Sequence, residues 1–514
     1  MSSPKKFYIT TAIAYTNAPP HIGFALELAQ ADAIARWRGL RGEKRFFLTG
    51  TDEHGRKNAQ AAEAAGKDPK TFVDEMSSKY QELAKALNIS NDDFIRTSDQ
   101  KRHWPGVIKF WKELHAAGDL YKGKYKGLYC IGCEAFKKPS DLSLHAGKLW
   151  CPDHHKEPDE VEEENWFFRL SKYEKELLQI VGRDLLRIIP ETRKNEVLAF
   201  IAQGLEDVSF SRPSRDLSWG IPVPGDNTQT MYVWADALVN YLTGIGYGQD
   251  TRPTSPASEL VGGRARNKTQ DTKFQEFWPA DLHVVGKDIL RFHAVIWPAM
   301  LLSVKLPLPK ALLVHGHILS EGQKMSKTLS NAVDPFVAIE KYGADVARYF
   351  LLKEIPTTDD GDITEQRFKD VYETELANSF GNLLSRVAKL ATGEEIMPKA
   401  GEEVREVVKR AWEDYEAAFG KYALHEATNH TLALANFANE FIERTKPWES
   451  KEGREGALPQ LIYILGNIAW MLAPFLPETS RKMFDQLGLD SNSTDLWEQK
   501  AVKVRKGEAL FPRL

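Results

Sequence analysis

The three cysteines of the chain lie in one short segment together with a histidine. Cys130 and Cys133 are separated by two residues, and so are Cys151 and His154. Two such pairs joined by a short loop are typical of a tetrahedral Cys3His zinc site. Thiols without a metal are the alternative, and His155 competes with His154 as the fourth ligand. The spacing favours His154, and four protein ligands predict a structural zinc ion.

A second group of reactive side chains lies in GHILSEGQKMSKTLSN (316–331), where two glycines precede Lys324 and Lys327. A loop with two ammonium groups can close over a polyphosphate and stabilise the charge that develops as pyrophosphate leaves. A solvated lysine-rich turn is the alternative. PPHIGF (19–24) supports the first interpretation, because it follows a predicted strand and opens a helical pattern whose free N–H groups can face a phosphate.

A carboxylate follows the strand-like segment RFFLTG (45–50). Asp52 is expected at the carboxyl edge of a parallel sheet, where α/β proteins bind ligands. The alternative is that Asp52 caps the next helix or pairs with Arg56 or Lys57.

The elements that must position these groups follow from hydrophobic periodicity. Residues 7–15 and 45–50 are predicted strands, and helical patterns span 25–40 and begin again near 57, which indicates a parallel α/β sheet. This pattern resumes in 231–242, 282–301 and 311–319. Residues 252–270 are polar and rich in Pro, Gly and Ser, as in a surface insertion. After about 365 the patterns are helical, which predicts a bundle.

Composition restricts the class of protein. The chain has 514 residues, 42% hydrophobic and 27% charged, with a net charge of −4. This charge argues against a generally cationic nucleic-acid binder but permits local basic patches. Apolar runs stay below the ~18 residues of a membrane span, and the N-terminus shows no signal segment. Three cysteines suit a disulfide framework poorly, so a cytoplasmic location is expected.

The motifs together, in their order, resemble class I aminoacyl-tRNA synthetases and, more narrowly, the methionyl-tRNA synthetase family. The resemblance covers the whole chain and is carried by PPHIGF, GTDEHG (50–55), MYVWADAL (231–238), GKDILRFH (286–293) and KMSKT (324–328). It implies ATP-dependent ligation of L-methionine to tRNA(Met) through methionyl-adenylate, with magnesium on the ATP. It also implies a Rossmann-type catalytic domain, split by a zinc-bearing insertion and followed by an all-α anticodon-binding bundle.

The resemblance implies domain boundaries as well. The catalytic domain would have two halves, 1–115 and 226–320, around a connective insertion with the zinc knuckle at 116–225. The KMSK loop and stem-contact region would span 321–365, and the anticodon-binding domain 366–514. A monomer is expected, because no appended domain follows the bundle.

The family's functional residues map onto this chain. Asp52 would hold the ammonium group of methionine with the backbone of Ile13, and the rest of the methionine pocket would be Ala12, Tyr15, Trp234, Ala237, Tyr241, Ile289, His293 and Trp297. The ATP site would be formed by His21, Phe24, Glu27, Gly286, Asp288, Ile318, Lys324 and Lys327, with His21 and the two lysines catalytic. The anticodon would be read by Asn382, Arg386 and Trp448; a capped helix and a tryptophan buried in the bundle are the alternative.

The chain departs from the family signature at Phe24, where the family has a second histidine. A phenyl ring can pack beside adenine but cannot donate a hydrogen bond, which is worth about 0.5–1.5 kcal/mol, or about two when charge-assisted. We therefore expect an active enzyme. The rival hypotheses are a catalytically weak or silent tRNA-binding paralogue and a class I synthetase for another amino acid such as cysteine.

Overall fold

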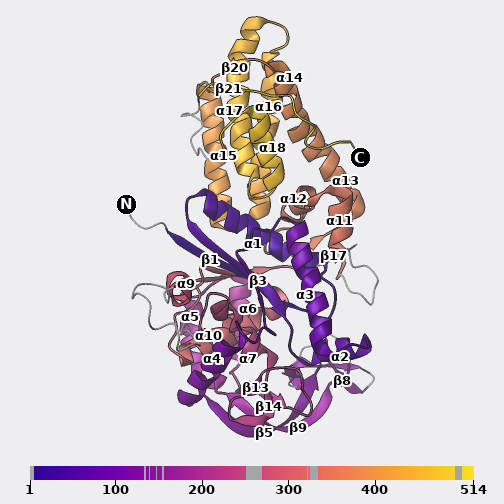
Figure 1. The fold of residues 1–514 in the computed structure, drawn as a ribbon, viewed down its shortest axis with the longest axis vertical. Coiled ribbons are helices and arrows are strands. Elements are labelled where there is room, and N and C mark those ends of the chain that lie inside the picture. Colours follow the sequence, from indigo (N-terminus) through magenta and orange to yellow (C-terminus); the bar gives the residue numbers. More distant parts are fainter. Residues whose placement is uncertain are drawn as a thin grey trace, which may run out of the picture. The chain divides into compact units, whose positions relative to one another are not determined.

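The structure, a computed structural model, describes nine stretches of the chain. They are residues 5–131, 135–137, 139–145, 147–152, 155–249, 269–320, 322–324, 334–491 and 500–513. The contacts between residues divide the chain into two compact units, which are described separately (Figure 1). Unit 1 comprises Met1–Pro20, Glu43–Glu82 and Asn91–Val314, and unit 2 comprises His21–Gly42, Leu83–Ser90 and His315–Leu514.

The centre of unit 1 is a seven-stranded sheet whose assigned pairs are parallel. Its strand order is β10-β16-β15-β1-β3-β2, with β4 also paired to β3. The strands are β1 (Lys6–Thr11), β2 (Ala14–Tyr15), β3 (Lys44–Asp52), β4 (Asp93–Arg96), β10 (Arg187–Ile189), β15 (Leu282–Gly286) and β16 (Ala311–His315). Side chains on both faces are buried in β15 and β16, which suits a parallel sheet covered by helices. The predicted parallel sheet is therefore confirmed.

Two details of the sheet differ from the sequence-based expectation. The single strand predicted for residues 7–15 is divided into β1 and β2. The second strand does not stop at Gly50 but continues to Asp52. A Cβ atom on Gly50 would lie 2.1 Å from the carbonyl oxygen of Ile95 in β4. Gly50 thus permits the close approach of β4 rather than ending β3.

Helices and an antiparallel insertion complete unit 1. The helices are α2 (Arg56–Ala64), α3 (Pro69–Ala86), whose last residues belong to unit 2, α4 (Trp104–Ala116), α5 (Glu174–Gly182), α6 (Glu191–Ala202), α7 (Val233–Ala237), α8 (Asn240–Thr243), α9 (Thr269–Phe277) and α10 (Trp297–Ser303). The insertion contains the sheet β11-β9-β5-β6 and the sheet β12-β14-β13. These strands are β5 (Leu120–Cys130), β6 (Ala135–Lys137), β9 (Asp159–Phe168), β11 (Val208–Ser209), β12 (Ser211–Pro213), β13 (Pro222–Val223) and β14 (Asp226–Met231). A small hairpin, β7 (Ser143–His145) and β8 (Lys148–Trp150), lies between β6 and β9 along the chain.

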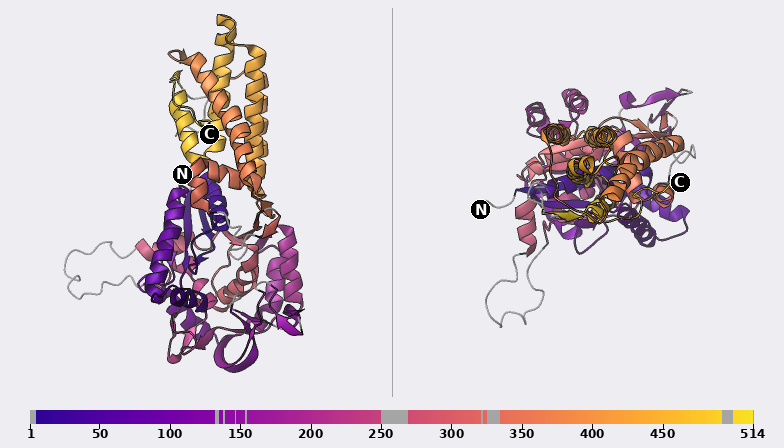
Figure 2. Two further views of the ribbon diagram at one scale, coloured as in Figure 1. Left: turned by 90° about the vertical axis from the view of Figure 1, so that its right-hand side faces the viewer. Right: turned by 90° about the horizontal axis from the view of Figure 1, so that it is seen from above.

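Unit 2 is mainly helical, as predicted for the chain after residue 365. Its helices are α1 (Ile22–Leu40), α11 (Pro335–Tyr342), α12 (Ala344–Glu354), α13 (Glu365–Val371), α14 (Asn382–Ala391), α15 (Glu402–Gly420), α16 (Leu424–Thr445), α17 (Lys451–Leu472) and α18 (Pro477–Leu487), with a π-helical turn at Tyr372–Gly381. Seen from above, the long helices of the bundle are viewed along their axes (Figure 2). Short strands β17 (Ile318–Ser320), β18 (Gln323–Lys324) and β19 (Gly361–Asp362) form one sheet, and β20 (Glu395–Ile396) pairs with β21 (Val502–Lys503).

Helix α1 packs within unit 2 through its aromatic and charged side chains. Trp37 stacks on Phe419 of α15 with ring centroids 5.0 Å apart. Asp32 and Arg348 of α12 form a fully buried ion pair of 2.7 Å. The helix that begins within the PPHIGF segment is thereby attached to the helical part of the chain. Across the described residues, no helix is long and apolar enough to cross a bilayer.

Candidate active site

The residues predicted for the methionine pocket all belong to unit 1. They lie at the ends of strands, in the loops after strands or in the helices that follow them. Ala12, Ile13 and Tyr15 lie at and just after the end of β1, and Asp52 ends β3. Trp234, Ala237 and Tyr241 lie in α7 and α8, and Ile289, His293 and Trp297 follow β15. The carboxyl ends of β1, β3 and β15, which are neighbours in the sheet, supply or precede all of these residues except Trp234, Ala237 and Tyr241, which follow β14.

Strand pairing and ring contacts connect the Asp52 position to the aromatic side chains. Tyr15 is the cross-strand partner of Asp52 in the β2–β3 pair. The Tyr15 ring meets the Trp234 ring edge-on, with centroids 6.5 Å apart and an interplanar angle of 90°. Trp234 in turn meets the ring of His293 at 6.1 Å and 89°. The structure thus brings together residues from four separate segments of the sequence.

Burial determines the protonation state of His293, and its hydrogen bonds determine its tautomer. Burial lowers the pKa of His293 to about 4, so the ring is neutral at pH 7. Its Nδ1 lies 3.1 Å from the carbonyl oxygen of Ile289, which can only accept, so Nδ1 carries the proton. Nε2 is then an acceptor, and the Tyr241 hydroxyl, 2.7 Å away, donates to it. Trp297 completes this group, with its ring centroid 6.0 Å from that of Tyr241.

Asp52 is 2% exposed, and its main chain is fixed from two sides. Its carbonyl oxygen accepts hydrogen bonds from Nδ2 of Asn58 at 3.0 Å and from the backbone N–H of Thr16 at 3.2 Å. Asp52 lies at the carboxyl end of β3, the end of a parallel strand where α/β proteins bind ligands. This position suits a carboxylate that receives the ammonium group of a ligand.

Several residues of this region were not predicted from the sequence. Phe292 stacks on Trp234 with ring centroids 3.7 Å apart and planes 8° from parallel. His283 lies against Tyr241, with centroids 4.3 Å apart. His54 contacts Asp236 through a buried hydrogen bond of 2.7 Å. Phe292 adjoins His293 and His54 lies in the same motif as Asp52, so proximity along the chain was the available signal for both.

Five of the residues predicted for ATP belong to the described part of unit 2: His21, Phe24, Glu27, Ile318 and Lys324. For Lys324 the structure describes the main chain only. His21 is the N-cap of α1, and its side chain accepts a hydrogen bond from the N–H of Gly23 at 3.1 Å. Phe24 is buried in α1. Oε2 of Glu27 lies 2.9 Å from Nε2 of His315. Ile318 begins β17, and Lys324 lies in β18.

Of the other residues predicted for ATP, two lie in unit 1 and one is not described. Gly286 ends β15 in unit 1 and is followed by the exposed Asp288. Lys327 lies outside the described residues. The structure therefore leaves the expected lysine loop as a sequence-based prediction.

The three predicted anticodon readers lie in unit 2. Asn382 is exposed at the start of α14, and Arg386 lies one turn later. The Arg386 guanidinium carbon is 5.5 Å from the centroid of the Trp448 ring, and its Nη2 forms a 2.7 Å ion pair with Glu443. Trp448 is 44% exposed. The alternative of a tryptophan buried in the bundle is therefore wrong. The Trp448 indole is exposed, and the Arg386 guanidinium lies over its ring.

The predicted zinc ligands are described only in part. Cys130 and Cys151 are 3% and 0% exposed, whereas Cys133 and His154 lie outside the described residues. His155, the alternative ligand, is exposed and has a positive φ of 50°. No cluster of three or more metal-ligating side chains occurs within the described stretches. Two buried thiols fit a metal site, and the three side chains of β7, which lies between Cys130 and Cys151 along the chain, are exposed.

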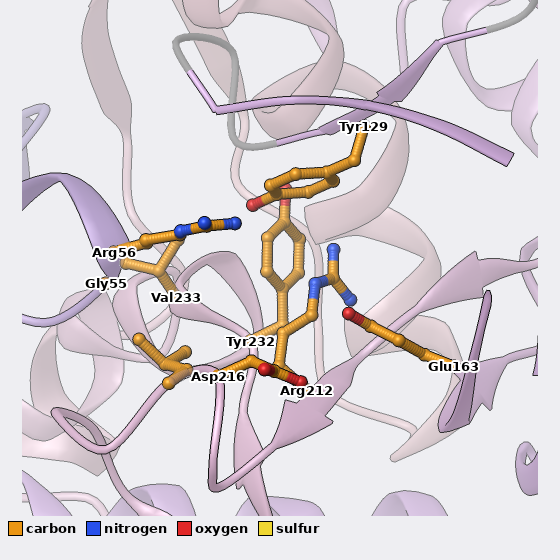
Figure 3. A pocket seen from close by; sticks show the side chains of 9 residues that line it. Gly55, Arg56, Tyr129, Glu163, Arg212, Asp216, Tyr232 and Val233 are labelled. Atoms are coloured by element: carbon orange, nitrogen blue, oxygen red, sulfur yellow. The ribbon is translucent and has the colours of Figure 1, made fainter. Parts of the chain in front are cut away.

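A pocket lined by charged and aromatic side chains lies beside the methionine residues along the chain (Figure 3). Its lining includes Gly55, which follows His54, and Val233, which precedes Trp234. The Arg212 guanidinium lies 5.1 Å from the ring centroid of Tyr129 and 4.8 Å from that of Tyr232. None of the residues predicted for methionine or ATP lines this pocket.

Comparisons with known proteins give one consistent result. Residues 7–160 and 144–388 match the family "tRNA synthetases class I (M)", and residues 402–510 match "Anticodon-binding domain of tRNA ligase". The chain is 40% identical to the methionine–tRNA ligase of Thermotoga maritima, over 99% of this chain and 80% of the relative. It is 38% identical to that of Brucella suis, over 99% and 98%.

A solved structure of Mycobacterium tuberculosis methionyl-tRNA synthetase in complex with methionyl-adenylate is also similar. It has a TM-score of 0.89 at 36% identity and covers 99% of this chain and 100% of that chain. The free form of the same enzyme has a TM-score of 0.82 at 33% identity, over 100% and 99%.

Proposed function

The chain belongs to the methionyl-tRNA synthetases of class I, and from this membership we propose how its residues divide the work of the reaction. The reaction is the ATP-dependent ligation of L-methionine to tRNA(Met). The methionine carboxylate attacks the α-phosphorus of ATP, pyrophosphate leaves, and the terminal ribose of the tRNA then displaces AMP from methionyl-adenylate. No protein nucleophile is needed, so catalysis consists of positioning and charge stabilisation.

Asp52 binds the ammonium group of methionine with the backbone of Ile13, and the remaining pocket residues enclose the side chain. This assignment rests on one observation above all. The contacts from Asp52 through Tyr15 and Trp234 to His293 and Tyr241 join residues that are far apart in the sequence. Ala12, Ala237, Ile289 and Trp297 belong to the same pocket in this proposal.

The aromatic lining explains why such a pocket suits a thioether. One methylene contributes only about 1–3 kcal/mol to discrimination, so size alone separates methionine poorly from leucine. Contacts between sulfur and aromatic rings add about 0.3–1.5 kcal/mol. The Tyr241 hydroxyl already donates to the neutral His293, so this pair presents a fixed surface to the side chain.

In this proposal ATP carries Mg²⁺ and is bound by the residues that match the family's ATP-binding motifs. His21, Lys324 and Lys327 act on the phosphates, Glu27, Gly286 and Asp288 on the ribose, and the Ile318 backbone on adenine. The position of His21 as the N-cap of α1 supports its part, because a helix N-terminus attracts anions. Phe24 packs near adenine without donating a hydrogen bond, and the other groups compensate.

Asn382, Arg386 and Trp448 read the CAU anticodon. Their support is the exposed indole beside a guanidinium, since unpaired bases stack on aromatic rings and on arginine. In this proposal the catalytic domain comprises 1–115 and 226–320, the KMSK loop and stem-contact region spans 321–365, and the anticodon-binding domain spans 366–514.

A structural zinc ion is held by Cys130, Cys133, Cys151 and His154 in this proposal, where it stabilises the insertion. The burial of two of the thiols supports it. We also assign the protein to the cytoplasm, where thiols remain reduced.

ATP–pyrophosphate exchange with a panel of amino acids tests the proposal. Exchange with methionine alone supports it. Exchange with cysteine would favour a synthetase for that amino acid. No exchange with any amino acid, together with retained tRNA binding, would favour a silent tRNA-binding paralogue. Loss of methionine exchange in Asp52→Ala, with the fold intact, checks the central residue.

A further inference from the structure

The end of β3 carries three consecutive ionisable side chains that are all buried. Asp52, Glu53 and His54 are 2%, 0% and 1% exposed. The proposed reaction uses only Asp52. Glu53 is held by Arg96 through two hydrogen bonds, of 2.6 Å to Oε1 and 2.9 Å to Oε2. His54 forms a hydrogen bond with Asp236 of α7.

Asp236 forms hydrogen bonds with two imidazole rings. Its Oδ2 accepts a hydrogen bond from Nδ1 of His54 at 2.7 Å, and its Oδ1 accepts one from Nε2 of His103 at 3.1 Å. Nδ1 of His103 lies 2.8 Å from the hydroxyl of Thr243. Burial opposes ionisation of Asp236, but the two histidines hold its pKa below the usual range. A buried, ionised carboxylate therefore lies at the centre of this network.

The network connects the two sides of the methionine pocket. His54 lies two residues beyond Asp52, the proposed ammonium ligand. Asp236 lies in α7 between Trp234 and Ala237, which are assigned to the wall around the side chain. A change in the Asp236–His54 contact would therefore shift the end of β3 relative to α7.

Other contacts fix the main chain at the end of β3 but do not reach α7. Nδ2 of Asn58 donates to the carbonyl oxygens of Asp52 at 3.0 Å and His54 at 2.8 Å. These bonds restrain the turn itself. The distance between the turn and Trp234 is set through side chains, of which His54 and Asp236 form a direct link.

Stability alone accounts poorly for an ionised group at this place. Removing a charge from water is costly, and apolar residues of similar volume often replace buried ionic networks without loss of stability. If the Asp236 network serves only packing, side chains of the same volume can replace it. If it sets the distance between β3 and α7, its hydrogen bonds are required. Variants that keep volume and remove hydrogen bonds separate these roles.

We propose that Asp236 and His54 are positioning residues that place the Asp52 carboxylate at the correct distance from the Trp234 wall. This inference rests on the proposed role of Asp52 as the ammonium ligand. It predicts that the network affects recognition of the ammonium group and leaves recognition of the thioether side chain unchanged.

Two methionine analogues test this with the full-length protein. L-Methioninol keeps the ammonium group and lacks the carboxylate, whereas 4-(methylthio)butanoate keeps the side chain and lacks the ammonium group. We expect Asp236→Asn and His54→Leu to weaken inhibition of pyrophosphate exchange by methioninol about tenfold or more, and inhibition by the butanoate less than about twofold. His54→Asn should restore methioninol binding, because its side-chain N–H can replace Nδ1.

A matched control and a comparison with Asp52 make the result decisive. Tyr247→Phe removes another hydrogen bond of unit 1, that to Glu113, and should change neither inhibition constant. Equal weakening of both analogues in His54→Leu, or no weakening of methioninol, would overturn the inference. If Asp52→Ala itself leaves methioninol binding unchanged, the assignment of Asp52 fails instead, so the two failures are distinguishable.

Discussion

The Tyr241 hydroxyl donates a hydrogen bond of 2.7 Å to Nε2 of His293, and both side chains are buried in unit 1. Because the His293 ring is neutral and its Nδ1 proton is committed to Ile289, the direction of this bond is fixed. The two side chains therefore act as one rigid polar element in the part of the proposed pocket that also contains Trp234 and Trp297.

This relationship predicts the effect of Tyr241→Phe on substrate choice. Loss of the hydroxyl leaves Nε2 of His293 without its donor and makes the pocket more apolar. We expect the preference for methionine over norleucine, measured as the ratio of kcat/KM values in pyrophosphate exchange, to fall up to about tenfold. Tyr247→Phe provides the control for a lost tyrosine hydroxyl. An unchanged ratio in Tyr241→Phe would show that the pair does not contribute to selectivity.

The lowered pKa of His293 predicts a pH dependence of stability. Burial lowers it from 6.5 to about 4, so between these values the unfolded state binds more protons than the folded state. Stability is therefore full above pH 6.5 and falls as the pH drops toward 4. Relative to His293→Gln, which can still accept from Tyr241, the wild type should lose about 3 kcal/mol over this range. Urea unfolding of both proteins at several pH values measures it, and parallel curves would contradict the prediction.

Phe24 predicts the result of restoring the family's second signature histidine. The phenyl ring is buried in α1. In the proposed ATP site it cannot donate the hydrogen bond that the family's histidine would donate. We expect Phe24→His to raise kcat/KM for ATP at most ten- to a hundredfold, the equivalent of one hydrogen bond. Steady-state pyrophosphate exchange over a range of ATP concentrations checks this. A gain of many thousandfold would mean that the parent protein is catalytically impaired.

The sequence predicts the local elements well, because their signals are local. The apolar and aromatic runs that become β1 and β3 and the helical periodicity after residue 365 reflect the burial of neighbouring side chains. The break between β1 and β2 and the continuation of β3 through Gly50 depend instead on neighbouring strands. For Gly50, the deciding contact is with Ile95, which local propensity does not contain.

The candidate site is predicted only as far as motifs identify it. Asp52, Trp234 and His293 lie in recognisable motifs, and the structure brings their segments together. The Asp236–His54 bond joins positions 182 residues apart, so neither motif alone predicts it. Similarly, a domain boundary drawn along the chain cannot group His21–Gly42 with His315–Leu514, because long-range contacts define that unit.

The buried ion pair between Asp32 and Arg348 predicts a double-mutant result in unit 2. Arg348 is fully buried and also donates to the carbonyl oxygens of Leu87, Pro474 and Phe475. Removing Arg348 leaves the buried Asp32 carboxylate with Arg36 as its cationic partner and deprives three carbonyl oxygens of this donor. We expect Arg348→Met to lower the free energy of unfolding by about 3–5 kcal/mol.

The second substitution identifies the cause of this loss. Asp32→Leu combined with Arg348→Met removes both charges and should recover part of the stability, as urea unfolding followed by tryptophan fluorescence would show. If the double variant is as unstable as the sum of the single variants, the ion pair is not the source of the loss. Arg36, which also binds Asp32 at 2.7 Å, makes the recovery incomplete.

The exposed Trp448 beside Arg386 predicts a defect confined to the tRNA step. Stacking of an unpaired base on an aromatic ring contributes about 1–3 kcal/mol, so Trp448→Ala should lower kcat/KM for tRNA(Met) about 5- to 150-fold. Pyrophosphate exchange without tRNA should not change, because the proposed anticodon readers take no part in adenylate formation. Met397→Ala, which truncates another exposed apolar side chain of unit 2, is the control. An equal loss with an anticodon-substituted tRNA would show that Trp448 contributes binding but not recognition of the triplet.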